Sequence, residues 1–262
     1  MTRAIVMMVL ALGAADWARA DVTVKQTTTG KGLGMGANVA GTTYIKGGKM
    51  RADVVMGDKT QTTVFDVDAQ KMYIFDSKKK EADVWDMAAF GAEVARSVDL
   101  SSTKASLKPN GQTKQIAGKN AVGYDMDVSM DAAMSGSKGM TMTVTLQGPV
   151  WIVANASGAA DYARFYKAAV EKGFIFTDPR AAKAQPGQAR AVAEMYKQMA
   201  ATNGLPYITD IQIKMSGSGP MAGLLARMGN LSMTTTVESV EVGPLSDDLF
   251  APPAGYKLNP KK

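Results

Sequence analysis

The chain has 262 residues and a formal net charge of +6, and it contains no cysteine and no histidine. Without cysteine there are no disulfides, thiolate metal sites or cysteine nucleophiles, and without histidine the commonest general base and nearly every catalytic zinc site are missing. The basic residues are scattered and are not interleaved with aromatic side chains, so the charge does not indicate nucleic-acid binding. We therefore expect a protein that is not an enzyme and that binds no metal, cofactor or nucleic acid.

Residues 1–20 predict a cleavable signal peptide. Arg3 supplies a positive start, residues 4–14 form an apolar run, and Ala18-Arg19-Ala20 has the small-x-small pattern of a cleavage site. The run is shorter than the roughly 20 residues that a membrane-spanning helix needs. No second apolar run of that length follows. We therefore expect one domain over residues 21–262, periplasmic or secreted and not membrane-spanning.

Residues 42–85 predict a ladder of short antiparallel strands joined by tight turns. Gly47-Gly48 is a typical hairpin turn, because glycine reaches positive φ at no steric cost. Alternation along residues 49–56 places Met50, Val54 and Met56 on one side of the sheet. Residues 71–76 are apolar on both faces, so we expect this strand to be central or covered by a helix.

The rest of the chain alternates between strand and helix patterns. Helical spacing of apolar residues predicts helices at 86–100, 159–172 and 186–202. Residues 101–110 are polar and predict a loop, and residues 177–185 predict an irregular linker. Further strands are expected at 112–117, 121–129, 140–147, 150–154, 205–215 and 231–242. The helical insert at about 159–202 is typical of a cover or lid over a curved sheet.

Two stretches look like ligand-binding motifs and are better explained as ordinary structure. Residues 30–36 are rich in glycine, but no helix pattern follows them to complete a phosphate loop. Asp125-x-Asp127-x-Ser129 resembles the start of a calcium loop, but its sixth position is Met130 and its twelfth is Gly136.

Several segments occur in an order that resembles a known family. They are Tyr44–Arg51, Phe65–Asp68 with Lys71–Tyr73, Val150–Ile152, and Leu249–Tyr256. They resemble an exported bacterial family described only as domain of unknown function 4412, which is similar in turn to outer-membrane lipoprotein carriers of the LolA/LolB type. The resemblance implies a mainly β (α+β) fold: a curved, incompletely closed antiparallel β-barrel in the periplasm, with helices covering the open side. The carriers use the apolar concavity of such a barrel for acyl chains. The resemblance transfers no individual site residue.

Methionine is unusually frequent, with 19 in the chain, and this richness has more than one explanation. Methionine is unbranched and polarizable, so a cavity lined with it accepts apolar ligands of variable shape. It also serves as plain core filler in place of Leu and Ile. Thioethers also select Cu(I), and one cluster has suitable ligands. That cluster contains Met126, Met130, Met134, Met140 and Met142.

These patterns favour a non-catalytic periplasmic carrier or binding protein for a lipid, acyl chain or other hydrophobic ligand, with an outer-membrane or envelope component as a further partner. The residues expected to line its cavity are Met50, Val54, Met56, Met72, Ile74, Met140, Met142, Val144 and Trp151. A structural or envelope-stress protein without a small ligand is the alternative, and a Cu(I)-binding protein is a weaker one. A hydrolase would need paired carboxylates, for which Asp83 with Asp86 and Asp247 with Asp248 are candidates by proximity in the sequence.

Overall fold

A computed structural model describes residues 21–31, 38–97, 104–133, 141–184, 186–217, 222–223 and 231–261. The predicted signal peptide lies outside the described residues. Twelve strands form one sheet in the order β12-β6-β5-β4-β3-β2-β1-β11-β10-β9-β8-β7. All the described strand pairs are antiparallel except β12 with β6. The sheet is therefore mainly antiparallel. Among the described strands, β12 and β7 form its two edges and do not pair with each other, so the sheet is not closed into a barrel.

The first half of the sheet is the predicted ladder. Gly47 and Gly57 have φ of 57° and 63° in its hairpin turns, a region that glycine occupies without strain. The prediction of short antiparallel strands over residues 42–85 is confirmed. The strands are β1 (Val22–Lys31), β2 (Val39–Lys46), β3 (Lys49–Met56), β4 (Lys59–Asp66), β5 (Lys71–Asp76) and β6 (Glu81–Asp86).

The second half has longer strands than the sequence predicts. The loop expected at 101–110 is wrong for residues 104–110, which belong to β7 and pair with β8. The turn sequence Pro109-Asn110-Gly111 becomes an irregularity inside this strand, where the register shifts between Pro109 and Thr113. The strands are β7 (Lys104–Ile116), β8 (Lys119–Ala133), β9 (Thr141–Val153), β10 (Leu205–Gly217) and β11 (Leu231–Val242).

The helices occupy the three predicted regions, and one more helix lies where a linker was expected. They are α1 (Met87–Ser97), α2 (Ala159–Glu171), α3 (Pro179–Ala184) and α4 (Pro186–Ala200). α3 forms because Asp178 accepts a hydrogen bond from the Arg180 backbone N–H at 2.9 Å, which caps the helix, while Pro179 occupies its first position.

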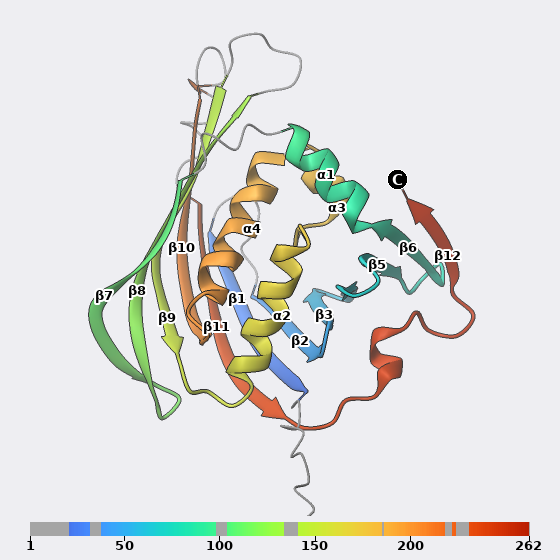
Figure 1. The fold of residues 1–262 in the computed structure, drawn as a ribbon, viewed down its shortest axis with the longest axis horizontal. Coiled ribbons are helices and arrows are strands. Elements are labelled where there is room, and N and C mark those ends of the chain that lie inside the picture. The colour runs from blue at the N-terminus through green and yellow to red at the C-terminus, as the bar shows by residue number, and fades with distance from the viewer. Residues whose placement is uncertain are drawn as a thin grey trace, which may run out of the picture.

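The sheet curves around α2 and α4, which lie side by side against its concave face (Figure 1). We call this the inner face. α4 packs against β8 and β9 through buried residues that include Met195 and Met199, while α2 contributes Tyr162, Phe165 and Tyr166 to a second cluster with β1–β6. What the contacts show is packing of helices on the inner face. The covering of the open side stays a prediction.

The outer face of the ladder is covered by the C-terminal segment. The short 3-10 helix η2 (Asp247–Phe250) packs against β3 and β4, and Arg51 donates a hydrogen bond to the Leu249 carbonyl at 3.2 Å. Tyr256 packs edge-on against Phe75, and β12 (Lys257–Lys261) then pairs with β6. The strand at 71–76 is therefore apolar on both faces because the tail, not a helix, covers its outer side.

None of the helices in the described part of the chain is long and apolar enough to cross a membrane.

The start of α2 gives a test of this packing. Gly158 precedes α2 with φ of 75°, and a Cβ there would lie 2.7 Å from Cγ2 of Val22. Gly47 has a similar φ of 57°, but a Cβ there would meet nothing within 4 Å. We expect Gly47→Ala to lose about 1 kcal/mol of unfolding free energy from backbone strain alone. Gly158→Ala should lose about 1–3 kcal/mol more because of overpacking, as measured by urea unfolding. Equal losses would show that α2 does not press on β1 at this point.

Candidate ligand-binding site

A cavity of about 250 Å³ lies between β1–β5 and the helices α2 and α4. Its floor is the inner face of the ladder, and its lining includes Met50, Val54, Met72 and Ile74. We call it the inner cavity.

The strand register explains why the floor leaves space there. Paired residues across the strands form rows, and the first row is a continuous set of large apolar side chains: Val22, Ile45, Met50, Phe65, Met72 and Trp85. The next row contains Val24, Thr43, Ala52, Thr63 and Ile74. Three of its members are Thr or Ala, and the row beyond it contains Gly41. The inner cavity is thus the volume that these short side chains do not fill.

Aromatic side chains from the helices and the α2–α3 connection form the roof. Tyr166 and Tyr196 stack with ring centroids 4.7 Å apart and an interplanar angle of 7°. Phe176 lies 5.0 Å from the Tyr166 ring and 4.9 Å from the Tyr196 ring, and its other neighbour is Phe65 of the floor at 5.7 Å. Since Tyr166 belongs to α2 and Tyr196 to α4, the stack joins the two helices directly above the inner cavity.

The polar groups of the inner cavity are neutral or already satisfied. Burial raises the pKa of Tyr162, Tyr166 and Tyr196, so all three phenols remain protonated at neutral pH. By strand alternation, the side chain of Asp53 points to the outer face, where its carboxylate accepts hydrogen bonds from Arg51 Nε at 3.0 Å and Thr62 Oγ1 at 2.6 Å. The inner cavity is therefore suited to an uncharged, mainly apolar group.

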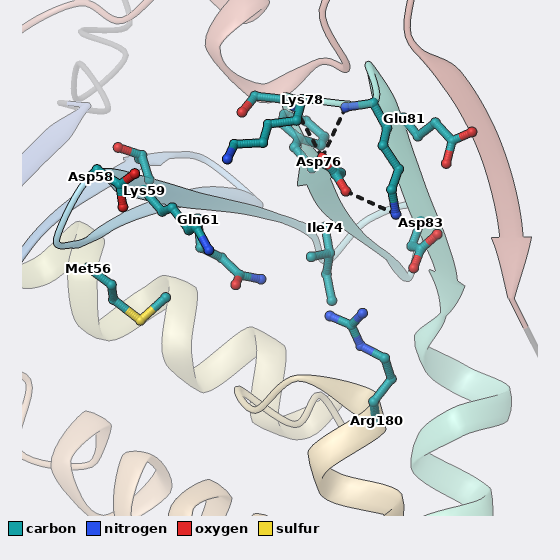
Figure 2. Close-up of a pocket in the computed structure, with 14 residues that line it drawn as sticks. Met56, Asp58, Lys59, Gln61, Ile74, Asp76, Lys78, Glu81, Asp83 and Arg180 are labelled. Carbon is teal, nitrogen blue, oxygen red and sulfur yellow. Dashed lines mark hydrogen bonds and ion pairs between the residues drawn. The ribbon is translucent and has the colours of Figure 1, made fainter. Parts of the chain in front are cut away.

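A second cavity, of about 420 Å³, lies beside the first at the β3–β4 and β5–β6 turns (Figure 2). We call it the outer pocket. Its lining is strongly polar and includes four basic and four acidic side chains: Lys59, Lys78, Lys79, Arg180, Asp58, Asp76, Glu81 and Asp83. The two cavities differ in chemistry, apolar and aromatic in one and charged in the other.

The two cavities share one lining residue, Ile74, and we call the boundary between them the neck. The partner of Ile74 on β4, Thr63, lines the inner cavity, and its partner on β6, Asp83, lines the outer pocket. Asp178 lines the inner cavity and Arg180 the outer pocket, and Figure 2 shows the Arg180 side chain extending toward Ile74. The two are ion-paired, with Nη2 of Arg180 2.5 Å from Oδ2 of Asp178. A ligand that occupied both cavities would therefore have to pass Ile74 and the Asp178–Arg180 pair.

The structure brings together some of the predicted cavity residues and separates others. Met50, Val54, Met72 and Ile74 line the inner cavity, and Met56 lines the outer pocket with half of its surface exposed. Val144 lines neither cavity and is buried in β9. Met140 lies outside the described residues, as does the side chain of Met142.

Trp151 also lines neither cavity. Its neighbours Val150 and Ile152 pack into the core under α4, so alternation turns Trp151 to the outer face. There the Lys114 ammonium lies 4.0 Å from the centroid of its ring. The space over the inner face of β8 and β9 is occupied by side chains of α4.

The other candidate constellations are dispersed or have structural roles. Met126 and Met130 pack with Met195 and Met199 in the core under α4, and Met134 lies outside the described residues. Asp83 pairs with Lys261 at 3.1 Å, whereas Asp86 caps α1 by accepting a hydrogen bond from the Ala89 N–H at 3.0 Å. Asp247 pairs with Lys46 at 3.0 Å. Among the described residues, no three acidic, His or Cys side chains are placed to hold a metal ion.

Sequence reasoning missed the roof as part of the site. The predicted helices at 159–172 and 186–202 carry Tyr162, Tyr166 and Tyr196 in their apolar stripes, but a stripe does not tell which part of a sheet it covers. The basic run Lys78–Lys80 lies in a turn, a position that by itself predicts solvated side chains, and the structure places Lys78 and Lys79 in the lining of the outer pocket.

A third hollow, of about 520 Å³, lies between α2 and α4 and is lined by no strand residue. Lys167, Arg190 and Glu194 lie on it, together with apolar residues of both helices. It contains none of the predicted cavity residues and is not enclosed between helices and sheet.

Comparisons with known proteins add little to this geometry. No family model matches the chain, so none supports the resemblance to the family of unknown function, and no curated protein matches it. The chain is distantly similar to an outer membrane lipoprotein-sorting protein domain from Vibrio parahaemolyticus, with 8% identity and a TM-score of 0.34 over 90% of this chain and 91% of that one. Two crystal forms of PNGF-II show 12% identity and a TM-score of 0.36 over 92% of this chain.

The chain spans about a third of the length of PNGF-II, 31% and 32% in the two crystal forms. Similarities at these TM-scores indicate no function for this chain.

The neck offers a test based on pH. The hydrogen bonds and charge of Arg180 lower the pKa of Asp178 below its ordinary value of 3.8. The ion pair therefore stabilises the fold above that value, and this stability is lost as pH falls through the lowered pKa. Asn caps helices as well as Asp, so Asp178→Asn should lose only the pair, about 0.2–1 kcal/mol at pH 7, since both side chains are partly exposed.

Asp178→Ala removes the cap of α3 as well and should cost about 1 kcal/mol more. Urea unfolding of the three proteins between pH 7 and pH 2 measures both effects. The gap between wild type and Asp178→Asn should close at the acid end, while the gap between the two variants should not depend on pH. A gap between wild type and Asp178→Asn that persists at the acid end would contradict the ion-pair explanation.

Proposed function

We propose that this protein is a non-catalytic carrier or binding protein for an acyl chain or similar hydrophobic ligand, and that it works outside the cytoplasm. The observation that carries the proposal is the inner cavity: a hollow of about 250 Å³ with Met50, Met72 and Ile74 in its floor and an aromatic roof. Methionine and aromatic side chains offer an apolar surface that adapts to ligand shape. The predicted signal peptide supports the location.

The size of the cavities fits a slender ligand. Sites for small molecules commonly measure about 300–1,000 Å³, so the outer pocket falls within that range and the inner cavity slightly below it. Burial of each methylene contributes about 0.8 kcal/mol, so ten buried methylenes would supply about 8 kcal/mol before the costs of binding. We therefore expect a dissociation constant in the micromolar range or weaker for a single chain.

Movement of the roof would widen the path of such a ligand into the inner cavity. We infer that α2 and α4 act as the cover of the curved sheet, hinged at the glycine-containing segments beside α2, Gly158 and Gly173, which both have positive φ. The stacked rings of Tyr166 and Tyr196 would keep the two helices together as one lid.

A pair of substitutions in β3 tests the proposal. Val54 lines the inner cavity, while Val55 points to the opposite face and is 41% exposed. We expect Val54→Trp to reduce uptake of a fluorescent fatty acid at least about tenfold, because the indole would occupy the space that the acyl chain needs. Val55→Trp introduces the same side chain one position away and should leave uptake unchanged.

Ile74→Trp provides a second blocked variant at the neck and should reduce uptake in the same way. Circular dichroism and urea unfolding would show that the variants keep the fold. Unchanged uptake in both Val54→Trp and Ile74→Trp, with the fold intact, would overturn the carrier proposal. A wild type that takes up no fatty acid would favour the structural role instead.

A further inference from the structure

Most of the carboxylates in the outer pocket lie close to a lysine ammonium group. Asp76 accepts hydrogen bonds from the backbone N–H groups of Lys78 and Lys79, and its carboxylate also pairs with Lys79 Nζ at 3.4 Å (Figure 2). These bonds lower the pKa of Asp76, the Lys79 backbone N–H first among them. Asp83 pairs with Lys261, and Glu81 lies 4.0 Å from Lys257. Three of the four carboxylates therefore have a cationic partner.

The basic groups are not all neutralised in return. Lys79 is paired with Asp76, and Arg180 with Asp178. Lys59 and Lys78, in contrast, form no ion pair with any residue that the structure describes, and the same holds for Asp58. Two ammonium groups and one carboxylate are thus left without a partner in the pocket lining, which leaves it with an excess of unpaired positive charge.

The position of these two lysines matters as much as their charge. Lys59 begins β4 directly after the Gly57-Asp58 turn, and Lys78 lies in the turn between β5 and β6. The outer pocket that they line shares the lining residue Ile74 with the inner cavity, so the two cavities lie on either side of it. A molecule whose apolar part occupied the inner cavity would leave its polar end in the outer pocket, beside them.

We propose that the outer pocket selects an anionic head group, a carboxylate or a phosphate, on an amphiphile whose apolar chain lies in the inner cavity, with Lys59 and Lys78 as the selecting residues. This inference rests on the proposed carrier function and names the chemical class of its ligand. An ammonium head group would meet two unpaired cations and one unpaired carboxylate, so the pocket disfavours it. The lysines are exposed, so their effect is a preference of moderate size that salt screens.

The test compares two probes that differ only in the head group. Cis-parinaric acid is a fatty acid that fluoresces without an added label, and its methyl ester has the same chain without the charge. In low salt, the wild type should bind the acid about threefold to tenfold more tightly than the ester. Raising the salt concentration should shrink this ratio, because the attraction is screened.

Three variants of the full-length mature protein localise the effect. The double variant Lys59→Gln/Lys78→Gln should bring the ratio of acid to ester affinity close to one, with the ester affinity unchanged. Lys80→Gln removes a positive charge from the turn that also holds Lys78, but Lys80 does not line the outer pocket. The ratio of acid to ester affinity in this variant should therefore equal that of the wild type. Val54→Trp should weaken the binding of both probes, because the indole would occupy the space that their identical acyl chains need.

The outcomes separate this inference from the function on which it rests. If neither probe binds the wild type, the carrier proposal fails and the head-group inference falls with it. If both probes bind equally well, the carrier proposal stands and the inference is overturned. An equal loss of preference in Lys80→Gln would also overturn it, because a general surface charge would then be responsible.

A final arm distinguishes a lipid head group from a free anion. Inorganic phosphate is titrated calorimetrically into the wild type and into Val54→Trp. Absence of phosphate binding in both, together with a preference for the acid probe, supports an anion that is recognised only as part of an amphiphile. Phosphate binding that survives in Val54→Trp would show a free-anion site and would overturn the proposed ligand class.

Discussion

The site depends on a change in side-chain size along the inner face of the ladder. One row of paired positions carries large apolar side chains from Val22 to Trp85, and these side chains belong to the same buried core cluster as those of α2. The adjacent row has Thr43, Ala52 and Thr63 at its centre, which are too short to reach the aromatic roof. Because protein interiors are close-packed, such a mismatch leaves a hollow wherever the roof is held at the height of the larger row. The stack of Tyr166 on Tyr196 holds it there.

The chemistry of the two cavities follows from where the strands end. The inner cavity lies over the middle of the ladder, where inward positions are apolar or carry hydroxyl groups. The outer pocket lies at the turns, where charged residues such as Lys59 and Asp76 are favoured because the chain is in contact with water. An amphipathic ligand matches this gradient, and the Asp178–Arg180 pair marks the boundary. Over the inner face of β8 and β9, α4 fills the space with Ala191, Met195 and Met199.

Much of the site could be predicted from the ladder itself. Its turns set the register, and alternation then placed Met50, Val54, Met72 and Ile74 on one face, where they do lie around the inner cavity. Trp151 shows where that reasoning stops. The sequence predicts separate strands at 140–147 and 150–154 and places Trp151 in the cavity lining, whereas β9 is continuous from Thr141 to Val153 and turns Trp151 outward. Val144 is buried and pairs with Met130, which packs in the core under α4, but it lines neither cavity.

The sequence by itself determined the strands of the ladder, their turns, their inward face and the helical stripes, because these depend on contacts between residues that are close in the chain. Only the tertiary structure decided which stripe lies over which strands. That choice depends on packing between α2, α4 and a sheet whose partners are more than a hundred residues away, such as β1 with β11. The hollow under the Tyr166–Tyr196 stack is a property of that long-range packing, and so is the placement of Lys59 and Lys78 around a single pocket.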